Sequence, residues 1–221
     1  MTSPGVAEGR PGVLLYRGAE ADVMRGDWQG LDAVYKIRKP LLYRLTVLDD
    51  AIRKQRTIHE AQMIHLAKEA GVSSPYLYDV DLPSSTLVME YVKGDRLKDL
   101  IGSMSKRRAE LVFNEFGSSA GALHKAGIMH GDMTTANVIA RGGALVFIDF
   151  GLSTRTSRVE DHAVDLRLIK ETMAGAHPDE APAALEAFNR GYAGVAGQAR
   201  ARAVLKQLQA IERRGRYARV T

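Results

Sequence analysis

The sequence predicts an α+β fold of two lobes: a small, β-rich N-terminal lobe with one long helix, and a reduced, mostly helical C-terminal lobe. In the N-terminal third, short strand-like runs are separated by turns, and one long helical pattern follows them. From about Arg96 onward the apolar residues recur mainly at helical spacings. A group of carboxylates and a short hairpin interrupt this helical half. We therefore expect the two lobes to span residues 1–92 and 93–221.

Length and composition are those of a modest enzyme core. A chain of 221 residues with 45% hydrophobic content can bury a substantial core. The apolar runs are short and interrupted, so we expect no membrane span, no secretory signal and a cytoplasmic location. The chain has no cysteine, which excludes thiolate metal sites and thiol catalysis. Its net charge of +5 indicates a polyanionic partner.

The first predicted strands, 13–16 and 22–25, flank a turn at residues 18–21, and a third strand covers residues 33–37. Backbone amides in such a turn can cover the phosphates of a nucleotide. Only Gly18 is a glycine, so we expect a stiffer loop than one with three glycines. By itself the turn is indistinguishable from an ordinary hairpin, and its position before Lys36 favours the nucleotide loop. The residues expected to contact ATP here are Gly18, Ala19, Glu20, Ala21 and Val23.

Lys36 lies inside an apolar strand, where an ammonium group needs a partner. Enzymes of phosphoryl transfer use such a lysine to hold the α and β phosphates of ATP. The next helix can be capped by Asp49 or Asp50 and ends at Gly71, with Glu60 on or beside its apolar face. We therefore expect an ion pair between Lys36 and Glu60. The alternative is a lysine with its head in solvent and a glutamate on the helix surface.

Residues 86–92 read as a buried strand that runs into an extended connector. We interpret it as the link between the lobes. Backbone groups of Glu90 and Val92 would take the adenine edge, and Met89 would border the pocket behind it. A core strand that ends at a turn would show the same pattern. The helix that follows ends at Gly127 and should present one apolar face made of Val112, Phe116, Ser119 and Leu123.

The segment 130–137, His-Gly-Asp-Met-Thr-Thr-Ala-Asn, indicates phosphoryl transfer. This chemistry needs a carboxylate that orients the attacking hydroxyl and accepts its proton, and a second oxygen ligand five residues later for magnesium. Asp132 and Asn137 have that spacing. We therefore predict Asp132 as the catalytic base and Asn137 as a ligand of Mg²⁺.

Two short β-prone runs, 137–140 and 145–148, are joined by a turn at residues 141–143. Such a hairpin returns the chain so that Asp149 lies beside Asn137. A carboxylate there can ligate magnesium, a hard cation that prefers oxygen and is shared with the phosphates of ATP. Each fragment alone is common, but separate structural roles would not be expected to place loop, hairpin and second carboxylate in this order.

After Gly151 the chain has no activation segment. Only residues 152–159 separate it from the acids that open the next helix, so a platform for docking peptides has little chain to be built from. No arginine precedes Asp132, which argues against activation by a phosphorylated loop. Asp165, in the next helix, could either cap that helix or hold the backbone of residues 130–137, which we call the catalytic loop.

The chain resembles the small kinase subunits of the KEOPS complex, a family of atypical serine/threonine kinases and ATPases. The resemblance rests on segments spread over almost the whole chain: 17–21, 36–39, 53–60, 130–137, 148–153, 160–166 and the basic C-terminus. It implies a bilobal protein-kinase-like fold that binds ATP and Mg²⁺, with Lys36 and Glu60 positioning ATP. It also implies a threonylcarbamoyl transferase subunit that modifies tRNA, and other KEOPS subunits, as partners. The compact length favours an archaeal source.

Three questions stay open at this point. Kinase and ATPase activity would use the same residues, because both need an oxygen nucleophile near Asp132. A RIO-type atypical kinase of ribosome maturation is an alternative, although that family normally has a longer chain. A pseudokinase scaffold is another, although it would not need Lys36, Asp132, Asn137 and Asp149 together.

The C-terminus carries seven Lys or Arg residues between Arg200 and Arg219 against the single acid Glu212. We expect a helix through Val204, Leu208 and Ile211 and then a mobile basic tail. Such a tail could simply be solvated. It could also contact tRNA phosphates or a partner subunit through Arg213, Arg214, Arg216 and Arg219.

Overall fold

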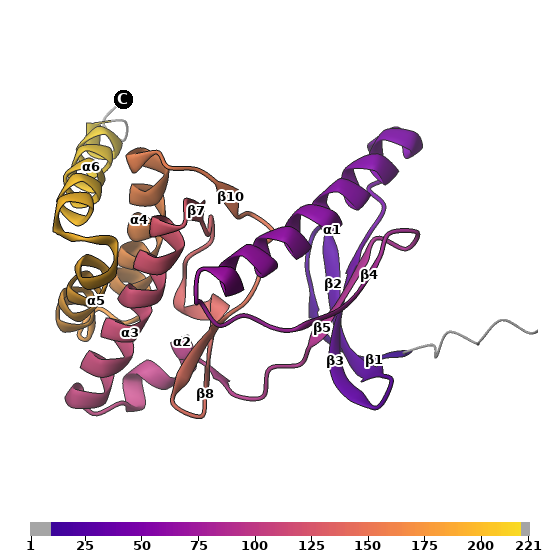
Figure 1. The fold of residues 1–221 in the computed structure, drawn as a ribbon, viewed down its shortest axis with the longest axis horizontal. Coiled ribbons are helices and arrows are strands. Elements are labelled where there is room, and N and C mark those ends of the chain that lie inside the picture. Colours follow the sequence, from indigo (N-terminus) through magenta and orange to yellow (C-terminus); the bar gives the residue numbers. More distant parts are fainter. Residues whose placement is uncertain (1–9, 218–221) are drawn as a thin grey trace, which may run out of the picture. The chain divides into compact units, whose positions relative to one another are not determined.

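The computed structural model describes residues 10–217 of the chain. The chain forms two compact units, which can be followed by the sequence colours in Figure 1. Unit 1 comprises Met1–Ile64 and Pro75–Lys93, and unit 2 comprises His65–Ser74 and Gly94–Thr221. No helix within residues 10–217 has both the length and the apolar character needed to cross a membrane.

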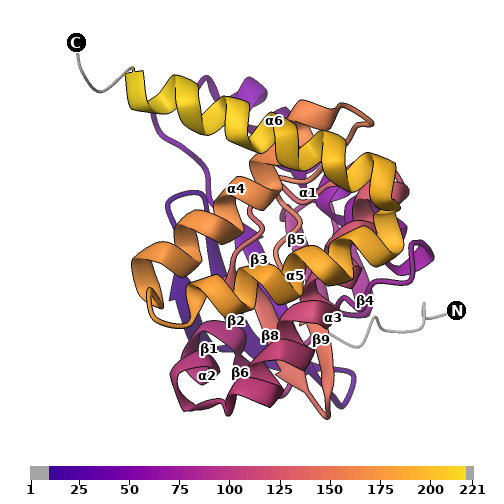
Figure 2. The ribbon, with the colours of Figure 1, turned by 90° about the vertical axis from the view of Figure 1, so that its left-hand side faces the viewer.

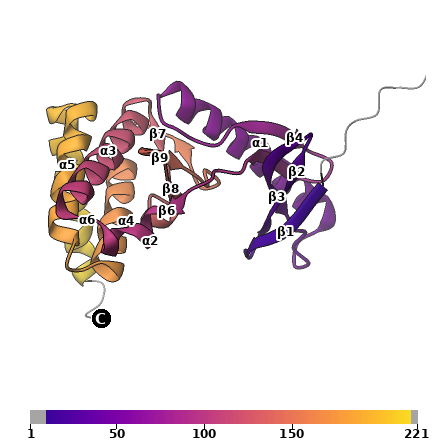
Figure 3. The same cartoon turned by 90° about the horizontal axis from the view of Figure 1, so that it is seen from below.

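Unit 1 is a five-stranded antiparallel sheet with most of one long helix, α1, beside it (Figure 1, Figure 3). Residues 65–69 at the end of this helix belong to unit 2. The strand order is β1-β2-β3-β5-β4. The predicted strands are present, most of them longer than expected. Their bounds are Arg10–Arg17 for β1, Ala21–Trp28 for β2, Leu31–Arg38 for β3, Leu77–Asp81 for β4 and Thr86–Glu90 for β5.

The two faces of β3 have different roles because side chains alternate along a strand. Ala33 and Tyr35 are buried with Val88 of β5 in an apolar cluster. The Tyr35 hydroxyl donates a hydrogen bond to the carbonyl of Asp27 (2.6 Å). Lys36 occupies the opposite face, and its register opposite Val23 and Leu87 puts it in the middle of the sheet.

Helix α1 (Thr46–Glu69) begins before the position that the sequence indicated. The predicted cap at Asp49 or Asp50 is wrong, because both residues lie inside the helix. Asp49 instead accepts a hydrogen bond from the backbone N–H of Leu41 (3.3 Å) and pairs with Arg53 (2.8 Å). The hydrogen bond from Arg53 lowers the pKa of the Asp49 carboxyl. At the other end Gly71 has the left-handed backbone (φ +79°) expected of a residue that ends a helix.

Unit 2 is mainly helical, and Figure 2 shows its C-terminal helices facing the viewer. Two very short antiparallel sheets, β6-β8-β9 and β10-β7, support its central loops. The longer helices are α3 (Lys106–Lys125), α4 (Val159–Ala176), α5 (Ala181–Ala196) and α6 (Gln198–Tyr217). The shorter elements are β6 (Asp95–Arg96), α2 (Leu97–Leu100), η1 (Ile101–Ser103), β7 (Ile128–Met129), η2 (Thr135–Asn137), β8 (Val138–Arg141), β9 (Ala144–Phe147) and β10 (Thr154–Arg155).

Helices α3 and α5 approach closely at two glycines. A Cβ atom on Gly117 would lie 1.9 Å from the carbonyl oxygen of Phe188, and one on Gly191 would lie 1.9 Å from that of Asn114. Only glycine allows this contact between the helix backbones. Beside it, the ring of Phe116 meets the ring of Phe188 edge-on, with centroids 5.3 Å apart.

The buried face of α3 is broader than the predicted one. Phe116 and Leu123 are fully buried as expected, whereas Val112 and Ser119 are only half-buried. The additional buried residues are Phe113, Gly117, Ala120, Gly121 and His124. The difference arises because α3 packs against both α5 and the β7–β9 region. A single apolar stripe along the helix is too narrow to cover both contacts.

The predicted hairpin after the catalytic loop is confirmed. Strands β8 and β9 pair in register from Val138 opposite Phe147 to Arg141 opposite Ala144. The turn consists of Gly142 and Gly143, both with positive φ (57° and 93°), as a tight two-residue hairpin requires.

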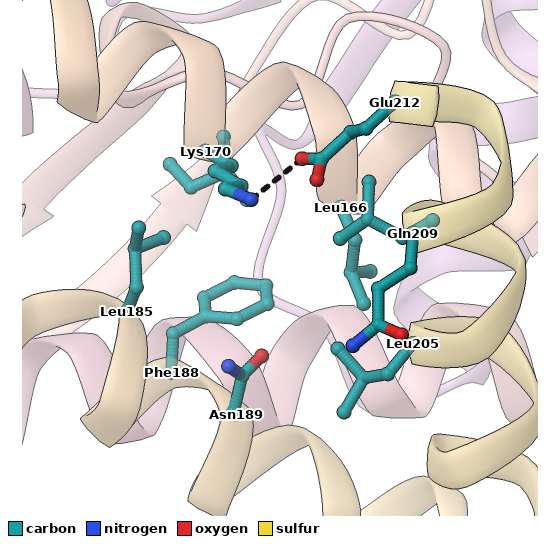
Figure 4. A pocket seen from close by; sticks show the side chains of 10 residues that line it. Leu166, Lys170, Leu185, Phe188, Asn189, Leu205, Gln209 and Glu212 are labelled. Carbon is teal, nitrogen blue, oxygen red and sulfur yellow. Dashed lines mark hydrogen bonds and ion pairs between the residues drawn. The ribbon is translucent and has the colours of Figure 1, made fainter. Parts of the chain in front are cut away.

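The basic C-terminus differs from the prediction. Helix α6 continues through Tyr217, so the expected mobile tail does not begin after Ile211. Ion pairs from α6 to α4 accompany the extra turns: Glu212 pairs with Lys170 (2.6 Å) and Arg214 with Glu160 (3.5 Å). The Lys170–Glu212 pair borders a cavity of about 220 Å³ between α4, α5 and α6 (Figure 4). Arg219 lies outside the described residues.

Candidate active site

In unit 1, Lys36 and Glu60 form the predicted ion pair. The Nζ atom of Lys36 lies 2.7 Å from Oε1 of Glu60, and the two side chains are 12% and 1% exposed. A carboxylate buried to this degree needs compensating charge. The alternative of a solvent-facing lysine and a surface glutamate is therefore wrong.

The sequence interpretation missed a second cation on Glu60. Arg38 donates from Nη2 to Oε2 of Glu60 at 2.6 Å, and its side chain is 8% exposed. Both oxygens of the carboxylate are thus engaged. Alternation along β3 places Arg38 on the same face as Lys36, and this spacing is the signal that could have revealed it.

The turn that precedes β2 is tied to β3. Because Ala21 is the first residue of β2, the turn is one residue shorter than predicted. The N–H of Gly18 donates to the carbonyl of Ala21 (2.9 Å), and Lys39 donates from Nζ to the carbonyl of Gly18 (2.7 Å). Glu20 forms an ion pair with Arg56 of α1. These contacts join the turn to α1 and to the residue that follows β3. The expected stiffness of the loop stays a prediction.

The connector after β5 is anchored within unit 1. Met89 and Val92 are buried, and the N–H of Glu90 donates to the carbonyl of Tyr76 (2.8 Å). The path of the backbone is therefore determined by the sheet. Adenine contacts by these residues stay a prediction.

In unit 2, Asp132 and Asn137 are in direct contact. The amide Nδ2 of Asn137 donates to Oδ2 of Asp132 (2.6 Å) and to its backbone carbonyl (3.0 Å). The N–H of Ile148 donates to the carbonyl of Asn137 (2.9 Å). The hairpin therefore brings the chain back beside Asn137 at the residue directly before Asp149.

Asp149 has an unusual backbone. Its φ of +62° lies in the left-handed region, which is uncommon for any residue other than glycine. Its Oδ1 atom accepts a hydrogen bond from the N–H of Gly151 (3.3 Å), which supports this conformation. Its side chain is exposed. Backbone strain of this kind costs about 1–3 kcal/mol and clusters at functional sites.

Asp165 holds the catalytic loop from below. Its carboxylate is fully buried and accepts hydrogen bonds from the backbone N–H groups of His130 (2.7 Å) and Gly131 (2.9 Å). His124 of α3 contacts the same carboxylate through Nε2 (3.1 Å). Of the two roles considered for Asp165, support of the loop is confirmed and capping of the helix is wrong, because α4 begins at Val159.

Two further features fix the loop backbone. Gly131 has a φ of +81°, and a Cβ there would lie 2.3 Å from the carbonyl oxygen of Leu152. His130 is fully buried, and its Nδ1 accepts from the N–H of Asp132 (3.3 Å). Burial lowers the pKa of the His130 imidazole, which favours its neutral form. Asp132 is thus attached to a rigid and uncharged support.

The segment after Gly151 is short and held at several points. Strand β10 pairs with β7, the strand that leads into His130. The hydroxyl of Ser153 donates to the carbonyl of His130 (2.8 Å), and the N–H of Thr156 donates to the carbonyl of Gly127 (2.8 Å). The absence of an activation segment thus leaves a connection bonded directly to the residues around the catalytic loop.

Comparison with known proteins agrees with this arrangement. The protein kinase domain family matches residues 44–190. The KEOPS complex subunit Bud32 of Pyrococcus abyssi is 38% identical over 210 residues, covering 92% of this chain and 96% of that protein. A probable bifunctional tRNA threonylcarbamoyladenosine biosynthesis protein of Methanobrevibacter smithii is 37% identical over 207 residues, which is 94% of this chain but only 37% of the longer protein.

The fold is also that of solved kinases. The Rio2 kinase from Chaetomium thermophilum, in a complex with ADP, Mg²⁺ and phosphoaspartate, matches with a TM-score of 0.61 at 18% identity, covering 94% of this chain and 72% of that one. At this identity the likeness concerns the fold alone. The identity to Bud32 over nearly the full length of both proteins favours the KEOPS interpretation over the RIO alternative. The chain belongs to the protein kinase domain family and, within it, to the family of the KEOPS complex subunit Bud32.

Proposed function

We propose that this chain is a Mg-ATP-dependent atypical serine/threonine protein kinase and/or ATPase that acts in a KEOPS complex and supports threonylcarbamoyl-adenosine modification of tRNA. The observation that carries the catalytic part is the 2.6 Å hydrogen bond between Asn137 and Asp132. Ile148, the residue directly before Asp149, donates its N–H to the carbonyl of the same Asn137. The names of the relatives support the biological part.

Asp132 is the proposed general base. It would orient the attacking oxygen, a hydroxyl of serine or threonine or a water molecule, and accept its proton. The hydrogen bond from Asn137 occupies one carboxylate oxygen and fixes the rotamer, so the other oxygen can face the nucleophile. Support of the loop by Asp165 keeps this oxygen in place.

The donor set near Asp132 fits Mg²⁺. No cluster of three or more His, Asp or Glu that could hold a metal occurs within residues 10–217, so protein carboxylates alone would not form a cage. Asn137 uses its amide nitrogen on Asp132, which leaves its oxygen to ligate a cation together with the exposed carboxylate of Asp149. Mg²⁺ commonly takes one or two protein oxygens and shares the phosphates of ATP, whose charge it neutralises.

The residues of unit 1 would bind the nucleotide. Lys36, oriented by Glu60, is proposed to hold the α and β phosphates. The turn and the connector would supply the remaining contacts to ATP, through Gly18, Ala19, Glu20, Ala21, Val23, Met89, Glu90 and Val92. The hydrogen bonds of the turn, from Gly18 to Ala21 and from Lys39 to Gly18, support a preformed rather than an adaptable phosphate site.

The proposed partners are a threonylcarbamoyl transferase subunit that modifies tRNA and other KEOPS subunits. This chain matches only 37% of the length of the bifunctional protein of Methanobrevibacter smithii. The remainder of that protein supports a partner that in other organisms is joined to the kinase in one polypeptide. The basic end of α6 is proposed to contact tRNA, and a cytoplasmic location goes with this role. A pseudokinase scaffold is disfavoured, because the Asp132–Asn137 and Lys36–Glu60 pairs are both intact.

The test is ATP turnover by the wild type and by Asp149→Ala, each alone and with the transferase subunit and tRNA. We expect turnover that needs Mg²⁺, rises within the assembly and falls by on the order of 10²-fold in the variant. Asp179→Ala, which removes an exposed acid from the turn between α4 and α5, is the matched control. Equal turnover of Asp149→Ala and the wild type would contradict the proposal.

A further inference from the structure

Four helices of unit 2 converge beneath the catalytic loop, and their contacts continue beyond Asp165. His124 of α3 places Nε2 on Asp165 (3.1 Å) and Nδ1 on the hydroxyl of Tyr192 of α5 (2.9 Å). The ring of His162 of α4 stacks on the ring of His124, with centroids 3.9 Å apart and planes at 10°. Both histidines are buried.

Arg200, in the first turn of α6, completes this network. Its Nη2 atom lies 2.7 Å from Nδ1 of His162 and 2.6 Å from the carbonyl oxygen of Ser157. The other ring nitrogen of His162, Nε2, lies 3.1 Å from the carbonyl oxygen of Thr156. Arg200 and His162 thus engage two successive carbonyls of the short connection between Gly151 and α4.

The partners define the protonation state of His162. A guanidinium group only donates, so Nδ1 of His162 must accept and carries no proton. A backbone carbonyl only accepts, so Nε2 must carry the proton and donate to Thr156. His162 is therefore neutral and serves as a bridge from Arg200 to the connection. A second proton, on Nδ1, would break the contact with Arg200.

The connection that Arg200 holds is coupled to the catalytic loop by several bonds. Thr156 donates to Gly127, β10 pairs with β7, and Ser153 donates to the carbonyl of His130. Protein kinases that place an arginine before the catalytic aspartate can hold this region by a phosphorylated activation loop. This chain lacks that arginine and that loop, so another group must order the connection.

We propose that Arg200 is a positioning residue for Asp132: together with His162 it holds the connection after Gly151 and the support of the catalytic loop in the active arrangement, in place of a phosphorylated activation segment. The inference rests on the proposed function of Asp132. It also makes helix α6 a structural part of the active site, since its first turn supplies the holding group.

The test is a double-mutant cycle of Arg200→Met and His162→Phe, in which Phe keeps an aromatic ring stacked on His124. Arg202→Met, an exposed arginine on the same helix, is the matched control. Turnover of Mg-ATP is measured at a temperature at which circular dichroism shows all proteins folded. We expect Arg200→Met to lower kcat on the order of tenfold with the KM for ATP nearly unchanged. The double variant should lose no more than the worse single variant, because the two residues act as one unit.

A second readout is independent of activity. The titratable and charged groups that face His162 are Arg200 from α6, His124 from α3 and Asp165 from its own helix. Burial, then His124 and Arg200, lower the pKa of His162 to about 4. Removal of the guanidinium should therefore raise the midpoint of the His162 signal in an NMR titration of Arg200→Met, and Arg202→Met should leave it unchanged.

The outcomes separate this inference from the proposed function. Two results would overturn the role of Arg200. In the first, ATP turnover depends on Asp132 but is unchanged in Arg200→Met. In the second, the losses of kcat in the two single variants multiply in the double variant. An unmoved His162 midpoint in Arg200→Met would overturn the contact itself. If Asp132→Asn turns over ATP as fast as the wild type, the proposed function fails instead, while the NMR titration still decides whether Arg200 bridges to His162.

Discussion

At the level of single residues, the buried carboxylate of Glu60 organises the basic side chains of β3. Its two oxygens pair separately with Lys36 and Arg38. The Lys36 pair could be predicted, because a lysine in an apolar strand needs an acid and the following helix offers one at a suitable position. The Arg38 pair could not, because alternation assigns a face to a side chain but not the partner that it meets there.

Replacement of Lys36 by alanine should weaken binding of Mg-ATP on the order of tenfold or more, because a methyl group offsets no phosphate charge in a partly desolvated site. Lys54→Ala, which removes a more exposed lysine from α1, is the control and should bind normally. Titration calorimetry with Mg-ATP measures both affinities. Unchanged affinity and turnover in Lys36→Ala would refute the assignment of Lys36.

Replacement of Glu60 by alanine should lower the free energy of unfolding by about 3 kcal/mol or more, because Lys36 and Arg38 would be left as buried charges without their acid. The control is Asp50→Ala on the same helix. Its ion pairs are more exposed, and their loss should cost less than about 1 kcal/mol. Urea denaturation compares the two variants. Similar losses of unfolding free energy in the two variants would show that the burial of Glu60 contributes little to stability.

At the level of elements, the catalytic loop, the β8–β9 hairpin and α4 form one bonded assembly. The hairpin could be predicted because two glycines and two β-prone runs specify it locally. The role of Asp165 could not be decided from the sequence, since its carboxylate meets N–H groups far away along the chain. Helix starts were displaced for a similar reason: Asp49 has a long-range partner in Leu41 and does not need to cap α1.

The buried histidines of this assembly predict a loss of stability in acid. The pKa of His162 is lowered to about 4 from an ordinary value of 6.5. The unfolded chain therefore binds the extra proton first as the pH falls through 6.5, and the native state is destabilised until the pH reaches about 4. His162 should therefore contribute roughly 1.4 kcal/mol per pH unit within that window.

Urea denaturation at pH values from about 4.5 to about 7.5 measures the free energy of unfolding across this window. His162→Phe should flatten the dependence of stability on pH relative to the wild type. Arg202→Met, which keeps every histidine and changes an exposed side chain, should leave the dependence unchanged. If the free energy of unfolding changes with pH at the same slope in His162→Phe and in the wild type, then His162 titrates in the native state as it does in water.

At the level of the whole molecule, the two-lobed fold class followed from the sequence, while the end of the chain did not. The apolar pattern of α6 stops at Ile211, and the sequence therefore favours a tail from there on. Ion pairs from Glu212 and Arg214 to α4 stabilise the further turns instead. Such pairs join residues that are distant along the chain, so no local pattern predicts them.

If the basic end of the chain contacts tRNA phosphates, replacing Arg213, Arg214, Arg216 and Arg219 by glutamine should weaken tRNA binding. At the three positions within α6 glutamine keeps the helical propensity and removes the charge, which at Arg214 includes the ion pair with Glu160. The slope of log affinity against log salt should become shallower by about 0.7–0.9 for each phosphate group that an arginine no longer neutralises. Arg190→Gln, an exposed change on α5, is the control. If the tRNA affinity and its salt dependence are both unaltered, these arginines do not contact tRNA and form a solvated surface.

The central claim is that Asp132 acts as the catalytic base, and Asp132→Asn tests it most directly. Asparagine is close to isosteric, so binding of Mg-ATP should stay near normal. The missing carboxylate should lower the rate of single-turnover phosphoryl transfer or hydrolysis by on the order of 10²-fold or more. Equal rates for Asp132→Asn and the wild type, at equal nucleotide affinity, would contradict the account.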